Sequence, residues 1–131
     1  MSSMKAHGTF EITMSAEPPY DVEGGVTLSR VSFEKVFSGG FAGTSKVHML
    51  AARTPEEGSA GYVALERLTG ALDGRRGGFV VMHLGVMDAG KTSLTLSIVP
   101  GSGTEELRGI AGRMTIEVVE GKHQYAVEYT L

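Results

Sequence analysis

The sequence predicts an all-β fold, an eight-stranded antiparallel β-barrel formed by residues 1–131 as a single domain. Apolar and polar residues alternate along most of the chain, which is the period of a half-buried strand. Glycine provides 19 of the 131 residues, about twice its usual share of roughly 7%, and it recurs where alternating segments meet. No segment shows a helical period of useful length, so the strands are expected to connect through tight turns.

Eight segments have the alternating pattern of strands: residues 5–14, 26–37, 41–53, 60–72, 77–88, 91–99, 113–119 and 122–131. The first ends before Pro18 and Pro19, because proline cannot donate to the ladder of a central strand. A loop is expected from there to Gly25. Residues 38–40 and 54–58 are the next turns, and residues 105–108 are expected to form one helical turn at most.

The clearest hairpin is centred on Asp73-Gly74, which lies between two apolar runs. This dipeptide favours a type I′ turn, which needs positive φ at both central positions. A two-residue turn determines the register of the hairpin. It pairs Leu72 with Arg75, Leu68 with Phe79, Glu66 with Val81 and Ala64 with His83.

Consecutive hairpins of similar strand length favour a meander that closes on itself, because closure removes the edges of an open eight-stranded sheet. A barrel of eight strands leaves a lumen for side chains or for one small ligand. The competing fold, a jelly roll, needs longer cross-sheet connections than these turns provide.

Composition limits the partners. Twelve basic and fifteen acidic residues give a net charge of −3, opposite in sign to a nucleic-acid-binding surface, so no nucleic-acid partner is expected. The chain has no cysteine, which suits a reducing compartment. Its first residues lack the apolar core of a signal peptide, and no run approaches the roughly 18 apolar residues of a membrane span. We therefore expect a cytoplasmic protein without a membrane partner.

Three stretches resemble a bacterial family known as domain of unknown function 3224: residues 62–70 (YVALERLTG), 78–85 (GFVVMHLG) and 99–112 (VPGSGTEELRGIAG). Structures of that family look like allene oxide cyclase barrels. Residues 101–104 (GSGT) also resemble the glycine-rich segment of allene oxide cyclases and plant dirigent proteins. The resemblance covers the chain from about Lys5 to Leu131, and it implies a barrel able to hold an apolar molecule.

Several patterns are interpreted as structural. Residues 101–103 have no following helix, so they are predicted to form a turn and not a phosphate loop. The four histidines are widely spaced and lack cysteine neighbours, so no metal and no cofactor are expected. Strand methionines are expected to fill core space, and they are Met14, Met49, Met82, Met87 and Met114.

The candidate site lies on one face of the Asp73-Gly74 hairpin, where Glu66 and His83 are diagonal neighbours within reach of each other. A carboxylate beside an imidazole in an apolar lumen is an arrangement that tunes pKa values for proton transfer. Glu66 and His83 are therefore the candidate catalytic residues. The candidate ligand-binding residues share their face: Tyr62, Leu68, Phe79, Val81 and, through a two-residue turn at Ala89-Gly90, Leu96.

The opposite face is strongly apolar and could instead be the core, with Glu66 and His83 outside as a structural ion pair. A one-residue slip exchanges the two faces. The family resemblance favours Glu66 and His83 inside, because the family usually has polar residues where this chain has Met82 and Leu84. The apolar face is then expected to contact a second copy in a homo-oligomer, through Val63, Leu65, Met82, Leu84 and Val86.

Three functions stay open at this point. The barrel could bind a small apolar molecule, with cyclase, isomerase or stereochemical-steering activity. It could be a non-catalytic carrier or sensor of such a molecule, or a packed oligomeric interaction module. A lumen above roughly 300 Å³ distinguishes the first two from the third.

Overall fold

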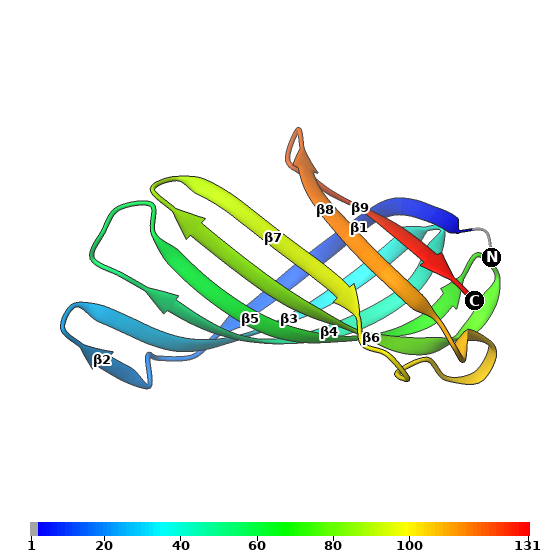
Figure 1. The fold of residues 1–131 in the computed structure, drawn as a ribbon, viewed down its shortest axis with the longest axis horizontal. Helices are drawn as coiled ribbons and strands as arrows, with labels where there is room; N and C mark the ends of the chain where they lie inside the picture. The colour runs from blue at the N-terminus through cyan, green and yellow to red at the C-terminus, as the bar shows by residue number, and fades with distance from the viewer. Residues whose placement is uncertain (1–2) are drawn as a thin grey trace.

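The computed structural model describes residues 3–131, which form a closed antiparallel β-barrel (Figure 1). In chain order the strands are β1 (Met4–Ala16), β2 (Asp21–Glu23), β3 (Val26–Gly39), β4 (Phe41–Arg53), β5 (Ala60–Leu72), β6 (Arg75–Asp88), β7 (Lys91–Ile98), β8 (Ala111–Val119) and β9 (Lys122–Thr130). A single 3₁₀ turn, η1 (Glu105–Leu107), precedes β8. The predicted all-β class and the single helical turn are confirmed.

Eight of these strands form the ring. Each pairs antiparallel with its neighbours in the order β1-β9-β8-β7-β6-β5-β4-β3, and β1 also pairs with β3 to close it. The eight-stranded barrel predicted from the sequence is therefore confirmed. Closure leaves no bare edge along the ring between β1 and β3, where an open meander would have two.

The additional short strand β2 corrects the sequence prediction, which placed residues 21–23 in a loop. β2 pairs with the start of β3, through a turn in which Gly24 and Gly25 have φ of +60° and +79°. Positive φ at both positions is typical of a type I′ hairpin turn. Three residues are too few to show an alternating pattern, so only the glycine pair could have indicated this strand.

The irregular segment between β7 and β8 forms hydrogen bonds with the backbone of β6, where a barrel would otherwise have a neighbouring strand. The Ser102 hydroxyl accepts a hydrogen bond from the Val80 amide at 3.0 Å, and the Thr104 hydroxyl accepts one from Gly78 at 2.9 Å. The polar side chains of residues 101–104 are therefore occupied by the β6 backbone. This agrees with the interpretation of that stretch as a structural turn.

The register of the β5–β6 hairpin is confirmed, with Leu72 opposite Arg75 and Ala64 opposite His83. The two-residue turn at Ala89-Gly90 is also confirmed. Glu66 is fully buried, whereas Leu65 beside it on β5 is 57% exposed. The face of Glu66 and His83 is therefore the inner one, and the apolar face is the outer one.

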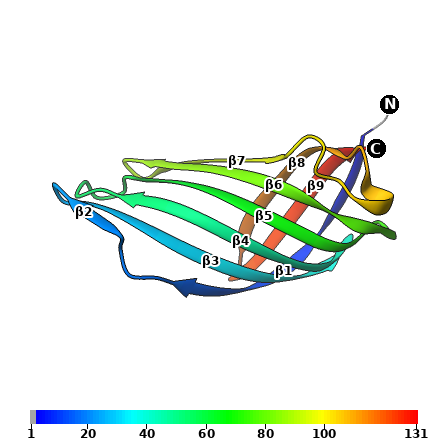
Figure 2. The same ribbon diagram turned by 90° about the horizontal axis from the view of Figure 1, so that it is seen from below.

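The barrel has a closed half and an open half. In the closed half, the segment after β7 contributes Leu107 and Ile110 to a buried cluster that also contains edge-to-face rings of Phe37, Phe41 and Phe79. In the open half, β3–β7 extend past β8 and β9 (Figures 1 and 2). β7 and β8 pair at only two positions, Leu96–Met114 and Ser97–Arg113. Inner side chains there are reached by solvent.

The methionines correct another expectation. Only Met114 is buried in the core, and Met49 is half-buried. Met14 is on the inner side of the open half and is 63% exposed, because no strand faces it there. Met82 and Met87 are also exposed.

Candidate functional site

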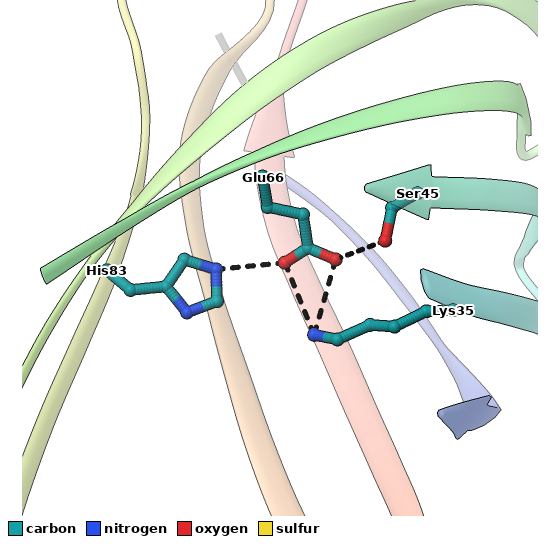
Figure 3. A network of polar contacts seen from close by, with 4 residues as sticks. All are labelled: Lys35, Ser45, Glu66 and His83. Carbon is teal, nitrogen blue, oxygen red and sulfur yellow. Dashed lines mark hydrogen bonds and ion pairs between the residues drawn. The ribbon is translucent and has the colours of Figure 1, made fainter. Parts of the chain in front are cut away.

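Four neighbouring strands contribute one polar side chain each to a network whose centre is the buried carboxylate of Glu66 (Figure 3). Glu66 on β5 accepts a hydrogen bond from Ser45 on β4 at 2.6 Å. Its other oxygen, Oε1, lies 2.9 Å from Nε2 of His83 on β6. Lys35 on β3 places Nζ 3.2 Å from Oε2 and 3.3 Å from Oε1. The predicted diagonal contact between Glu66 and His83 is present.

This network compensates for the desolvation of two charges. Burying an unpaired carboxylate or ammonium costs several kcal/mol, so buried charges are found paired and hydrogen-bonded. Lys35 has an additional partner, because Nζ lies 4.6 Å from the centroid of the Phe10 ring, in the range of a cation–π contact. Within residues 3–131, every fully buried side-chain nitrogen and oxygen has a hydrogen-bond partner.

The donors keep Glu66 ionised. Burial alone would raise the pKa of this carboxyl, but the hydrogen bond from His83, the charge of Lys35 and the Ser45 hydroxyl outweigh it and lower that pKa. Burial also lowers the pKa of Lys35, although Glu66 opposes this change. Because an ionised carboxylate only accepts hydrogen bonds, Nε2 of His83 must carry the proton that it shares with Glu66.

The second ring nitrogen of His83 has a different environment. Nδ1 makes no hydrogen bond to the described part of the chain, residues 3–131. Fully buried polar side-chain atoms there all have partners, so Nδ1 is reached by solvent. In a neutral imidazole with hydrogen on Nε2, Nδ1 has a free lone pair and can accept a proton or a hydrogen bond.

A hollow of about 180 Å³ lies in the open half, and none of the four network residues lines it. Tyr62 forms part of its wall, and its ring lies directly over Gly85, where an added Cβ would be 2.1 Å from the ring. Burial and the charge of Glu66 raise the pKa of the Tyr62 phenol, so it remains a neutral donor. The other inner residues around the hollow are mainly apolar: Met49, Ala51, Ala60, Met87 and Leu94.

The hollow is smaller than the roughly 300 Å³ typical of small-molecule sites. His83 does not line it. His83 and Gly85 are successive inward-facing residues of β6, and His83 is the one nearer the closed half. A molecule in the hollow would therefore contact Tyr62 and not His83.

The predicted ligand-binding residues lie in two different places in the barrel. Tyr62 lines the hollow. The remaining four are packed in the closed half, because Leu107, Ile110 and the phenylalanine rings fill the lumen at that end, and they are Leu68, Phe79, Val81 and Leu96. These four form the apolar surroundings of the Glu66 network and are not exposed to the hollow.

Two members of the network were not predicted, Lys35 and Ser45. The signal for Lys35 is present in the sequence, since it lies between Phe33 and Phe37 on the same face of a strand. A charge between two apolar inward positions predicts a buried charge that needs a partner. Ser45 has no comparable signal, because serine is common on either face of a strand.

A second hollow, of about 770 Å³, lies on the outer face over β3–β7 and has a mainly apolar lining. In residues 3–131 there is no group of three or more side chains suited to hold a metal ion. No helix in this range is long and apolar enough to span a membrane.

These features define a small antiparallel barrel with a buried ionic network and one open end. Residues 6–129 match the model of the family described as protein of unknown function (DUF3224), and the chain belongs to this family. It is similar to the crystal structure of a protein with unknown function from the same family in Shewanella oneidensis MR-1. The two share 39% sequence identity with a TM-score of 0.93, over 99% of this chain and 98% of the other. No curated protein matches.

Proposed function

We propose that this barrel binds a small, mainly apolar molecule in its open half, and that Nδ1 of His83 is the polar group that contacts it. The observation that carries the proposal is the asymmetry of the His83 ring. One nitrogen is held by a buried carboxylate at 2.9 Å, and the other is reached by solvent without a protein partner.

The surroundings support a ligand with an apolar body and one polar atom. The hollow of about 180 Å³ is below the size of most small-molecule sites. The inserted part of the molecule is therefore small, and the remainder would extend past Leu94 over the exposed inner surface. Tyr62, Ser29 and Thr92 line the hollow and are neutral donors for a carbonyl or hydroxyl oxygen.

The chemistry open to this site is proton transfer within one molecule. Nδ1 would take a proton from a carbon or hydroxyl of the bound molecule, while the Glu66 carboxylate stabilises the imidazolium. The proton would then return to another atom of the same molecule, so that an isomer forms without a co-reactant. A positioned base of this kind typically contributes 10²–10⁴-fold to a rate. The resemblance to allene oxide cyclases and dirigent proteins supports cyclisation or steering of an apolar intermediate.

The volume of the hollow favours a second candidate function, an interaction module without a ligand. At about 180 Å³ it is below the size of most small-molecule sites. In that case the network of Glu66 is purely structural. A non-catalytic carrier would be intermediate between these two functions, since it binds the molecule but does not change it.

Native mass spectrometry of the purified protein, followed by binding of the co-purifying molecule, tests the proposal. His83→Gln can keep a donor to Glu66 but replaces the basic Nδ1 by an amide oxygen at a different position. His48→Gln on the exposed outer face of β4 is the matched control. We expect His83→Gln to weaken binding about tenfold and His48→Gln to leave it unchanged. Equal binding by wild type and His83→Gln would contradict the role of Nδ1. Absence of any bound molecule, with no binding from a panel of apolar carbonyl compounds, would favour the interaction module.

A further inference from the structure

The outer surface of the barrel is divided into a polar side and an apolar side. Outward side chains of β1, β8 and β9 are mostly charged or polar, for example Lys5, Glu11, Arg113 and Glu117. Outward side chains in the middle of β4–β6 are apolar and between 44% and 57% exposed. We call this set the outer patch: Leu50, Val63, Leu65, Met82, Leu84 and Val86.

The outer patch is hollowed. The space of about 770 Å³ on this face is lined by side chains from five consecutive strands, β3–β7. Figure 2 looks onto this layer, with β8 and β9 behind it. Arg30 and His48 are the outward-facing titratable residues among the described residues that line the hollow, and none of those residues is a carboxylate. Apolar area dominates, so burial against hydrocarbon is the interaction that this face can make.

The total surface indicates the size of what covers it. The chain exposes 8177 Å², whereas a monomeric protein of 13.8 kDa is expected to expose about 6,600 Å². The excess is about 1,500 Å². A standard interface buries about 800 Å² on each partner, and homodimer interfaces often bury more. Exposed inner side chains of the open half and the aliphatic side chains of the outer patch both contribute to this excess. A second copy of the chain has the size to cover the outer patch.

We infer that the outer patch binds a second copy of this chain, in a symmetric dimer separate from the ligand site in the lumen. Closed two-fold dimers are the commonest assemblies of soluble homo-oligomers, and they join one surface patch to itself. The patch suits this role because its centre is apolar and free of like charges. Arg30 and His48 lie toward its β3–β4 side.

Sedimentation velocity at micromolar to tens of micromolar concentration tests this inference. We expect wild type to sediment with twice the chain mass of 13.8 kDa. Leu65→Lys places a charge in the centre of the patch and should weaken the dimer about 100-fold or more. Thr115→Lys adds the same charge at an exposed position on the polar side, on β8, and should leave the dimer unchanged.

A thermal melt provides the second readout, since dimerisation makes the melting temperature depend on protein concentration. This dependence is expected in wild type and Thr115→Lys and should be absent in Leu65→Lys, which keeps its β circular dichroism. A wild type that is monomeric at all these concentrations would overturn the inference. So would a Leu65→Lys dimer, or a monomer that binds a different protein through the patch.

Discussion

The two faces of the β5–β6 hairpin differ in a way that reverses the usual distribution of polar and apolar residues. The inner face has a buried carboxylate and imidazole, both with hydrogen-bond partners in the same chain. The outer face has a row of half-exposed aliphatic side chains, with Leu65 opposite Met82 and Val63 opposite Leu84. Local alternation therefore shows that two faces exist, while the remaining strands decide which one is enclosed.

The largest expected effect on stability comes from removing the negative charge of Glu66 on the inner face. Glu66→Gln leaves the Lys35 ammonium buried without its counter-ion, and we expect it to lower the free energy of unfolding by about 3–5 kcal/mol. Urea denaturation measures this loss. Lys35→Met in the Glu66→Gln background should recover much of it, because the second change removes the unpaired charge. A double variant as unstable as Glu66→Gln would show that Lys35 is not the cause.

A matched pair of leucines on β5 compares the faces directly. Leu68 is fully buried in the closed half, and Leu65 is 57% exposed on the outer patch. Leu68→Ala is expected to lower the free energy of unfolding by about 2–5 kcal/mol. Leu65→Ala should change that of the monomer by less than about 1 kcal/mol. Denaturation at concentrations low enough to dissociate the proposed dimer makes this comparison, and equal losses would contradict the face assignment.

The pH dependence of stability tests the ionised state of Glu66. Its pKa is lowered in the folded protein from the ordinary value of 4.5, so the unfolded chain takes up this proton first as the pH falls. The resulting stabilisation is complete above pH 4.5 and is lost as the pH falls from there through the lowered pKa. We expect wild type to lose stability in this range more steeply than the Glu66→Gln, Lys35→Met double variant. Parallel acid curves would show that Glu66 does not provide this contribution.

A smaller effect is expected where the closed half joins β6. Thr104→Val removes the hydroxyl that accepts from the Gly78 amide, and we expect a loss of about 1 kcal/mol in the free energy of unfolding. The ring of paired strands does not depend on this contact, so the β circular dichroism should be unchanged. Thr69→Val is the control, because Thr69 lies on the exposed outer side of β5.

The sequence predicted the barrel, the register of β5–β6 and the neighbourhood of Glu66 and His83. All of these depend on local information, namely two-residue periodicity and one Asp-Gly turn. Lys35, Ser45 and the division into a closed and an open half depend on how distant strands meet. The pairing of β7 with β8 at only two positions is an example, because nothing in either strand shows where their contact ends.

The packed environment of Leu68, Phe79, Val81 and Leu96 could not be predicted for the same reason. Those residues face the lumen as expected, but whether a lumen is empty depends on what else enters it. Leu107 and Ile110 come from an irregular segment whose path is set by tertiary hydrogen bonds to β6. Periodicity gives no information about that segment.

The central claim concerns the two nitrogens of His83, and ¹⁵N imidazole spectroscopy at mildly alkaline pH tests it most directly. The geometry predicts that His83 is held as one tautomer, with hydrogen on Nε2 toward Glu66 and a free lone pair on Nδ1. Exposed His48 is the internal reference, expected to show rapid averaging. If an apolar molecule co-purifies with the protein, as proposed, its addition should then shift the Nδ1 signal of His83 and leave that of His48 unchanged. A His83 ring protonated on Nδ1, or one that averages as His48 does, would contradict the account.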